Sequence, residues 1–379
     1  MVGIMKKEKK KVLVLYTNYG TGHYKAAIAI KEYIMTNYNN VEVFFMDPLT
    51  LGRPFVNKFF ANVGKILATR LRFLRRKIYK DKMYRNYFKR SWFYDFCIKL
   101  FFTKKVKEEI LNIDPDVIIS TQVGPTGVIA GNRKLFRAKL ISVLTDYGIH
   151  RMFTVAHEFV DTFWVPTDEL KEEMVELGIN EKKIIVTGIP VEDKFISNKK
   201  VDKKTYCEKW ELPINRPIFL FVCGGGNGYD NALKYFRKLL ELKYDFSYVF
   251  VAGKNKKLFK KAELIGDASS KFGVTLNYVD NMEDLLSISD LVFGKPGGLM
   301  TSEALTMNIP FIALDPIPGQ ETHNGKFIVD NDFGFLVNNK ADFAKFLDML
   351  KQDKELTTKW EKNIKANFKK FKFPDIKGI

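Results

Sequence analysis

The glycine and polar residues of segment 295–324 are the part of this chain whose types and spacing could do chemistry. Gly297 and Gly298 open a predicted helix, and the free N–H groups and positive dipole at its start suit an anion such as a diphosphate. Glu303 follows in the first turns, where its two oxygens could accept both hydroxyls of a ribose. Acceptors and donors for the hydroxyls of a sugar ring come from Gln320, Glu321 and Asn324. The segment therefore predicts a nucleotide-sugar site.

Alternating strand and helix patterns must position these residues. Short continuous runs of Val, Ile, Leu and Phe are separated by helical stretches, which is typical of parallel sheets covered on both faces. We predict strands at Val12–Tyr16, Val41–Met46, Val117–Ser120, Leu140–Leu144, Thr162–Val165, Ile184–Val186, Ile218–Val222, Tyr248–Ala252, Thr275–Tyr278, Leu291–Phe293 and Phe311–Leu314. Ligands are then expected at the carboxyl ends of these strands.

Length and composition predict two domains. The chain has 379 residues and 46% hydrophobic content, enough for two cores. The longest break in the apolar pattern, Glu192–Pro217, predicts the linker between domains 1–195 and 196–379. The basic tail Lys359–Lys377 is expected either to return to the first domain or to touch lipid.

Charge and cysteine content narrow the function classes. The formal charge of +18 implies an anionic partner, either nucleic acid or an acidic membrane surface. The three cysteines, Cys97, Cys207 and Cys223, have no CxxC spacing, so neither a disulfide framework nor a zinc site is expected, and reduced cytosol fits best. The basic N-terminus has no apolar region behind it, so a signal peptide is not expected. No apolar run approaches the ~20 residues that span a bilayer, so membrane contact would be peripheral.

A strongly basic segment distinguishes the two kinds of anionic partner. Between Arg53 and Lys107 there are seventeen Lys or Arg residues and two acids. Apolar residues recur there at helical spacing, and basic and aromatic side chains surround them, which favours anionic lipid over nucleic acid because no base-stacking signature is present. A solvated face of an ordinary helix is the alternative. The predicted membrane-binding residues are Arg70, Arg72, Arg75, Arg76, Lys77, Trp92 and Phe93.

Several motifs, in this order, resemble those of family 28 glycosyltransferases. They are Tyr16–His23, Leu144–His150, Val186–Pro190, Gly224–Gly228, Gly294 through Glu303, and Gln320-Glu321. The branch that they resemble contains the bacterial processive diacylglycerol glucosyltransferases and the monogalactosyldiacylglycerol synthases. The resemblance implies the GT-B fold, in which two doubly wound Rossmann-like α/β domains face a central cleft. It also implies a UDP-sugar donor in the C-terminal domain, a lipid acceptor over the N-terminal domain, and inversion without a tightly bound metal or other cofactor.

The resemblance also implies roles for individual residues. His23, at a helix start after the first glycine loop, could take the proton of the acceptor hydroxyl, and Asp146 could do so instead or could orient an imidazole. The acceptor loop would contain Gly20, Gly22 and His150. Phosphates would lie against Gly224, Gly225, Gly226, Asn227, Gly297 and Gly298, with Lys295 near them. Val279 would contact the uracil, Glu303 the ribose, and Gln320, Glu321 and Asn324 the transferred hexose.

The resulting hypothesis is a peripheral enzyme at the cytoplasmic face of the cell membrane. It would transfer a hexose, with glucose preferred, from a UDP-sugar to diacylglycerol or its glycosylated product. Another lipid acceptor, such as a polyprenyl-linked sugar, and a non-catalytic membrane or nucleic-acid binder are the alternatives. The residues leave open glucose versus galactose, and His23 versus Asp146 as the base.

Overall fold

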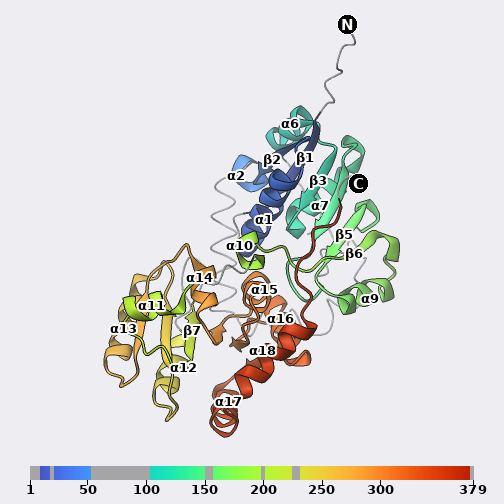
Figure 1. Ribbon diagram of the computed structural model, residues 1–379. Coiled ribbons are helices and arrows are strands. Elements are labelled where there is room, and N and C mark those ends of the chain that lie inside the picture. The colour runs from blue at the N-terminus through green and yellow to red at the C-terminus, as the bar shows by residue number, and fades with distance from the viewer. Residues whose placement is uncertain are drawn as a thin grey trace. The chain divides into compact units, whose positions relative to one another are not determined.

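The structure is a computed structural model, and it describes residues 9–17, 21–52, 103–149, 157–197, 201–223 and 231–375. The chain divides into two compact units, Met1–Glu192 with Phe371–Ile379, and Asp193–Lys370. Within the described residues, each unit contains one parallel sheet of six strands with helices packed around it (Figure 1). Each unit is therefore a doubly wound α/β domain.

The sheet of the first unit has the strand order β2-β1-β3-β4-β5-β6. Its strands are β1 (Lys10–Leu15), β2 (Val41–Met46), β3 (Val117–Ser120), β4 (Lys139–Val143), β5 (Thr162–Val165) and β6 (Ile184–Val186). Among the described residues, its α-helices are α1 (Thr21–Asn37), α2 (Pro48–Gly52), α6 (Lys104–Ile113), α7 (Val123–Gly131) and α9 (Asp168–Glu176). The strand order reverses between β1 and β3, so this is where a ligand is expected.

Both faces of this sheet are buried because successive side chains of β1 point to opposite sides. Val12 and Val14 pack with Ala27 of α1 in one cluster. Leu13 and Leu15 pack in a second cluster that includes residues of α6 and α7. A continuous apolar run in the sequence thus becomes a strand covered on both sides.

The sheet of the second unit has the strand order β12-β11-β10-β7-β8-β9. Its strands are β7 (Ile218–Val222), β8 (Ser247–Val251), β9 (Gly273–Leu276), β10 (Leu291–Gly294), β11 (Phe311–Leu314) and β12 (Gly334–Val337). Its helices are α10 (Asp193–Ile196), α11 (Lys203–Lys209), α12 (Ala232–Leu240), α13 (Lys256–Asp267), α14 (Met282–Ser287), α15 (Gly298–Thr306), α16 (Gln320–Asp330), α17 (Lys340–Gln352) and α18 (Leu356–Asn367). The strand order reverses between β7 and β10.

Phenylalanine rings form much of the core of the second unit. Phe221 of β7 stacks on Phe293 of β10 with ring centroids 4.5 Å apart. Phe236 of α12 meets Phe221 edge-on at 5.1 Å. The rings join the central strands to the helix that follows β7, because large aromatic side chains bury much apolar area each.

Several predicted strand bounds differ from the observed ones by one or two residues, as for β9, and the structure departs further from the predicted elements in two places. Strand β12 was not predicted, and the segment 192–217, predicted as a linker, contains the short helices α10 and α11. The backbone of Gly334 explains why β12 begins with glycine, since an added Cβ would lie 2.1 Å from the carbonyl oxygen of Phe311. Residues 53–102, most of the basic segment from Arg53 to Lys107, lie outside the described residues.

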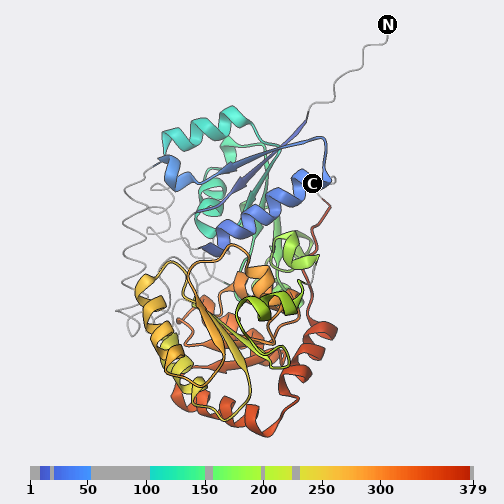
Figure 2. The same ribbon diagram turned by 60° about the vertical axis from the view of Figure 1, so that its left-hand side comes forward.

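Residues 371–375 belong to the first unit and pack on it (Figure 2). The backbone N–H of Lys372 donates to the Thr187 carbonyl at 2.8 Å. The ring of Phe373 stacks on Tyr33 of α1 at 4.1 Å and meets Trp164 of β5 edge-on at 5.2 Å. Residues far apart in the sequence are thereby joined in the first unit.

Two of the three cysteines lie among the described residues. Cys207 and Cys223 are both buried. No helix among the described residues combines the length and the apolar character that crossing a bilayer requires.

Candidate functional site

In the first unit, His23 lies where the ends of three neighbouring strands meet. It belongs to the first turn of α1, directly after the glycine loop that follows β1. Its ring nitrogen Nδ1 lies 3.0 Å from the carbonyl oxygen of Thr121, which follows β3, and 2.8 Å from the hydroxyl of Thr145, which follows β4. The Thr121 hydroxyl also donates to the His23 carbonyl at 2.9 Å. The imidazole is therefore fixed at the switch point of this sheet.

The contact with the Thr121 carbonyl favours the tautomer of His23 that carries the proton on Nδ1. A carbonyl oxygen can only accept a hydrogen bond, so a hydrogen bond to Thr121 requires the proton to be on Nδ1. The Thr145 hydroxyl then shares this donor as a second acceptor. Nε2 is left with the lone pair, which is the form that a general base requires.

Burial lowers the pKa of the His23 imidazole, because loss of water penalises its charged form. The Asp146 carboxylate and the Thr121 carbonyl act in the opposite direction, since both favour the protonated ring. Desolvation is the largest of the three effects, so the pKa lies below its ordinary value of 6.5. The ring is neutral at physiological pH and can accept a proton.

Asp146 is half-buried in the loop after β4 and acts electrostatically on His23. The structure thus brings together the two residues proposed as alternative bases. Gly22 lies in the first turn of α1, next to His23. The other residues predicted for the acceptor side, Gly20 and His150, lie outside the described residues.

Sequence reasoning missed Thr121 and Thr145, the residues that hold His23. Each is a buried polar residue at the carboxyl end of a predicted strand. This position is a usable signal, because the carboxyl ends of parallel strands meet at one edge of the sheet. Their pairing with His23 joins residues about a hundred positions away, which a single sequence does not reveal.

In the second unit, a tight turn at 295–297 leads from β10 into α15. The Gly297 N–H donates to the Lys295 carbonyl at 2.8 Å, and Gly297 is the residue that caps α15. A Cβ added to Gly297 would have no atom of the described residues within 4 Å, so these residues leave open space before the helix. Gly294 is different, because a Cβ there would lie 2.9 Å from the Val222 carbonyl of β7. The helix start is therefore held at the switch point of the second sheet.

Glu303 is a buried residue of α15, with 5% of its surface exposed. A carboxylate is kept at such a position only where polar groups compensate for the loss of water. Thr301, two residues before it, is fully buried, and its hydroxyl has no hydrogen-bond partner among the described residues. The inner side of α15 is thus unusually polar for a helix covering a sheet.

Helix α16 contributes the second predicted group of residues. The Asn324 side chain is fully buried and donates to the Pro296 carbonyl at 2.9 Å, which joins α16 to the loop before α15. The Glu321 carboxylate accepts from the backbone N–H of Ile317 at 2.7 Å. Gln320 is the first residue of α16, and its side chain has no hydrogen bond to another described residue. Segments 295–298 and 320–324 are thus brought together.

The remaining predicted donor residues are in two places. Val279 is half-buried in the loop between β9 and α14, and Lys295 is half-buried after β10. The glycine-loop residues Gly224, Gly225, Gly226 and Asn227 lie outside the described residues, as do the predicted membrane residues Arg70, Arg72, Arg75, Arg76, Lys77, Trp92 and Phe93.

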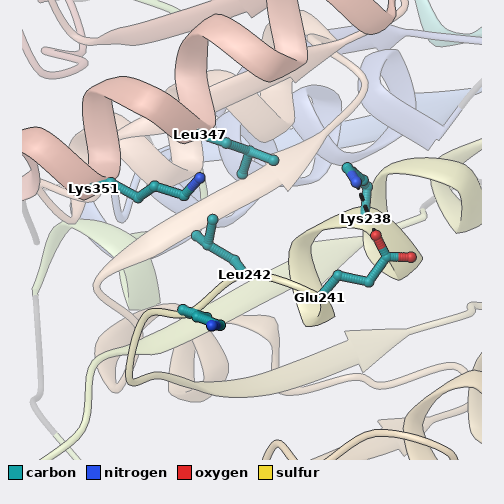
Figure 3. A pocket seen from close by; sticks show the side chains of 6 residues that line it. Lys238, Glu241, Leu242, Leu347 and Lys351 are labelled. Atoms are coloured by element: carbon teal, nitrogen blue, oxygen red, sulfur yellow. Dashed lines mark hydrogen bonds and ion pairs between the residues drawn. The ribbon is translucent and has the colours of Figure 1, made fainter.

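A separate cavity of about 360 Å³ lies between the ends of α12 and α17 (Figure 3). Leu242 and Leu347 line it together with three lysines and Glu241, which is paired with Lys238 at 2.9 Å. Both helices end there after running back from the carboxyl edge of the sheet, so this cavity lies at the opposite edge from Gly297 and Gln320. Among the residues that the structure describes, no three His, Cys, Asp or Glu side chains are grouped as metal ligands would be.

Two family models match the chain, one in each half. Residues 23–191 match the monogalactosyldiacylglycerol (MGDG) synthase model. Residues 202–367 match the model for glycosyl transferases group 1. The first match begins at His23, and the second includes α15 and α16.

Relatives similar over nearly the whole chain are named processive diacylglycerol beta-glucosyltransferases. The protein of this name from Bacillus licheniformis is 27% identical over 94% of this chain and 91% of its own length. The one from Bacillus subtilis has the same identity and coverage. The resemblance inferred from the motifs is thereby confirmed.

Solved structures share the fold. MurG of Acinetobacter baumannii matches with a TM-score of 0.64 at 11% identity, over 95% of this chain and 96% of its own. The S. aureus MnaA-UDP co-structure matches with a TM-score of 0.61 at 15% identity, over 93% of this chain and 91% of its own. The predicted pair of Rossmann-like domains of the GT-B fold is confirmed.

Proposed function

We propose that this chain, a glycosyltransferase of the GT-B fold, transfers a hexose from a UDP-sugar to diacylglycerol. The observation that carries the proposal is its similarity, across 94% of its length, to proteins named processive diacylglycerol beta-glucosyltransferases. Glucose is the preferred hexose, and the product is a β-glycosyl diacylglycerol. The enzyme can use that product as its next acceptor, which would make transfer processive.

The donor is proposed to bind at the switch point of the second sheet. The N–H groups at the start of α15 and the open space at Gly297 suit a diphosphate. Glu303 would accept the ribose hydroxyls, and the loop with Val279 would contact the uracil. Gln320 is free to bind the hexose, whereas the buried Asn324 amide positions the loop before α15 and so supports the same subsite.

The transfer step is proposed to use His23 as the general base. Its Nε2 lone pair would take the proton of the acceptor hydroxyl while that oxygen attacks the anomeric carbon and the UDP diphosphate leaves. Asp146 would stabilise the imidazolium that forms, because it favours the charged ring. The start of α15 and Lys295 would stabilise the negative charge of the leaving group, so we expect no tightly bound metal.

The acceptor requires contact with lipid, and we propose that the basic segment from Arg53 to Lys107 provides it at the cytoplasmic face of the membrane. Its seventeen basic residues exceed its two acids, and each one near an anionic surface contributes about 1 kcal/mol of attraction. Vesicle flotation should depend on anionic lipid and on salt. It should weaken when Arg72, Arg75 and Arg76 are changed to Gln, but not when the exposed lysines Lys257, Lys260 and Lys261 of α13 are changed in the same way.

Thermal unfolding with UDP-glucose tests the donor site. A ligand at a hundred times its Kd stabilises the folded state by about 2.7 kcal/mol, so the melting temperature should rise clearly. Glu303→Gln should remove most of this rise. Asp290→Asn is the matched control, because Asp290 lies at the amino end of β10 and bonds to Ile218 and Lys203. Absence of any shift with UDP-hexoses in the unmodified chain would contradict the proposal.

A further inference from the structure

Asp315, directly after β11, is held by two side chains from the first turns of α12. Its carboxylate accepts from the Tyr235 hydroxyl at 2.5 Å and from the Lys234 ammonium at 2.8 Å. Asp315 and Tyr235 are both buried, with 8% and 1% of their surfaces exposed. Hydrogen bonds to an ionised group are among the stronger ones in proteins, so this cluster holds α12 and the end of β11 together.

The backbone at Asp315 begins an unusual loop. Its φ is +43°, in the left-handed region, and Asp tolerates that conformation better than most residues do. Four residues later Gly319 has a φ of +113° and caps α16. Between these two points the Ile317 N–H is held by the Glu321 carboxylate at 2.7 Å. The loop is therefore fixed at its start by Asp315 and at its end by Glu321.

This loop positions Gln320 at the candidate sugar subsite. Because Gln320 directly follows Gly319, a rotation of the loop at Asp315 moves its side chain. The Asn324–Pro296 bond holds α16 one turn further along, so it limits movement of the helix but not of the loop before it. The contacts of Asp315, together with the hydrogen bond between Ile317 and Glu321, fix the loop that leads to Gln320.

Of the two side chains that bond to Asp315, Tyr235 holds the carboxylate more firmly than Lys234 does. Its ring is enclosed beside Phe343 of α17, with centroids 4.9 Å apart, so its hydroxyl has a fixed position. The Lys234 side chain is 40% exposed, and water screens its ion pair with Asp315. The Tyr235 hydroxyl therefore orients the Asp315 carboxylate, and the Lys234 ammonium contributes a favourable charge interaction.

We propose that Asp315, held by Tyr235 and Lys234, is a positioning residue that sets the sugar-binding segment 315–321 for the hexose of the donor. This inference rests on the proposed function. The two side chains that hold Asp315 come from α12, whereas Glu303 lies in α15 and His23 lies in α1. Loss of the cluster should consequently affect recognition of the hexose and leave recognition of UDP intact.

The test compares UDP with UDP-glucose in the full chain. Tyr235→Phe removes one hydroxyl, and Asp315→Asn keeps a side chain that tolerates positive φ while placing an amide against Lys234. We expect kcat/KM for UDP-glucose to fall about tenfold in each, because a misplaced binding group weakens transition-state contacts. The inhibition constant of UDP should change by less than about twofold, since UDP lacks the hexose.

Asp332→Asn is the matched control at the other end of α16. Asp332 also has a positive φ, of +53°, and also accepts from a buried aromatic side chain, Trp360, at 2.9 Å. It should leave both constants unchanged. If the two test variants lose UDP and UDP-glucose equally, or lose neither, the inference is wrong. If the unmodified chain binds no UDP-sugar, the proposed function is wrong, and the inference, which depends on it, is wrong as well.

Discussion

His23 provides the sharpest prediction, because its structural and catalytic roles depend on different ring nitrogens. Nδ1 donates to Thr121, while Nε2 holds the lone pair proposed to accept a proton. The amide of an asparagine side chain reaches about as far as Nδ1 and no further. His23→Asn therefore keeps the hydrogen bond to Thr121 and removes the base, whereas His23→Ala removes both.

The structure gives different magnitudes for the two variants. Loss of a general base costs about 10²- to 10⁴-fold in rate, or roughly 3–5 kcal/mol of transition-state stabilisation. His23→Asn should show this loss in kcat with a change of less than about 1 kcal/mol in the free energy of unfolding. His23→Ala should show the same loss in kcat. It should also unfold more easily, by about 1–3 kcal/mol, because buried acceptors lose their donor.

Three measurements test this reasoning: the rate of glycosyl transfer, the melting temperature shift with UDP-glucose, and unfolding in urea. Both variants should still bind UDP-glucose, since the donor residues are in the other unit. A His23→Asn enzyme with more than a tenth of the original kcat would refute the role of His23 as base. Asp146 would then be the remaining candidate, and Asp146→Asn should be the variant that loses activity.

Two further predictions concern stability. The pKa of His23 is lowered on folding, so protons bind the unfolded chain more tightly; the free energy of unfolding should fall as pH drops below 6.5, and less so in His23→Asn. Equal pH dependence in both proteins would contradict this. Phe373→Ala should cost about 2 kcal/mol in urea unfolding because it removes contacts with Tyr33 and Trp164, whereas Lys372→Ala, which leaves the backbone N–H in place, should cost less than about 0.5 kcal/mol. Similar costs for the two changes would exclude the proposed anchoring by the ring.

Local patterns predicted most of the fold. The buried strands are short runs of large apolar residues between helical stretches, and runs such as Ile218–Val222 gave correct bounds. The strand that was missed, β12, opens on Gly334 and has only three apolar residues after it. Glycine is required there by the approach of the Phe311 carbonyl, a contact between segments that the sequence does not show.

The candidate site was predictable in position but not in environment. The glycine loop before His23 and the glycines before α15 located both switch points. The lowered pKa of His23 results from burial, which outweighs the opposing effect of the Asp146 carboxylate, and both effects depend on the folded structure. Asn324 has the residue type of a sugar ligand, yet its amide binds Pro296. The sequence did not predict a role for Asp315, because its partners Lys234 and Tyr235 lie about eighty positions away in the chain.

The central claim is that this chain joins a hexose to diacylglycerol through a β linkage. The most direct test incubates purified protein with UDP-glucose and anionic vesicles containing diacylglycerol, and then resolves the lipids by mass and by the proton coupling at the anomeric carbon. We predict monoglucosyl diacylglycerol in the β configuration, followed by species with further hexoses. Release of free glucose without a glycolipid, or a product with the α configuration, would contradict the account.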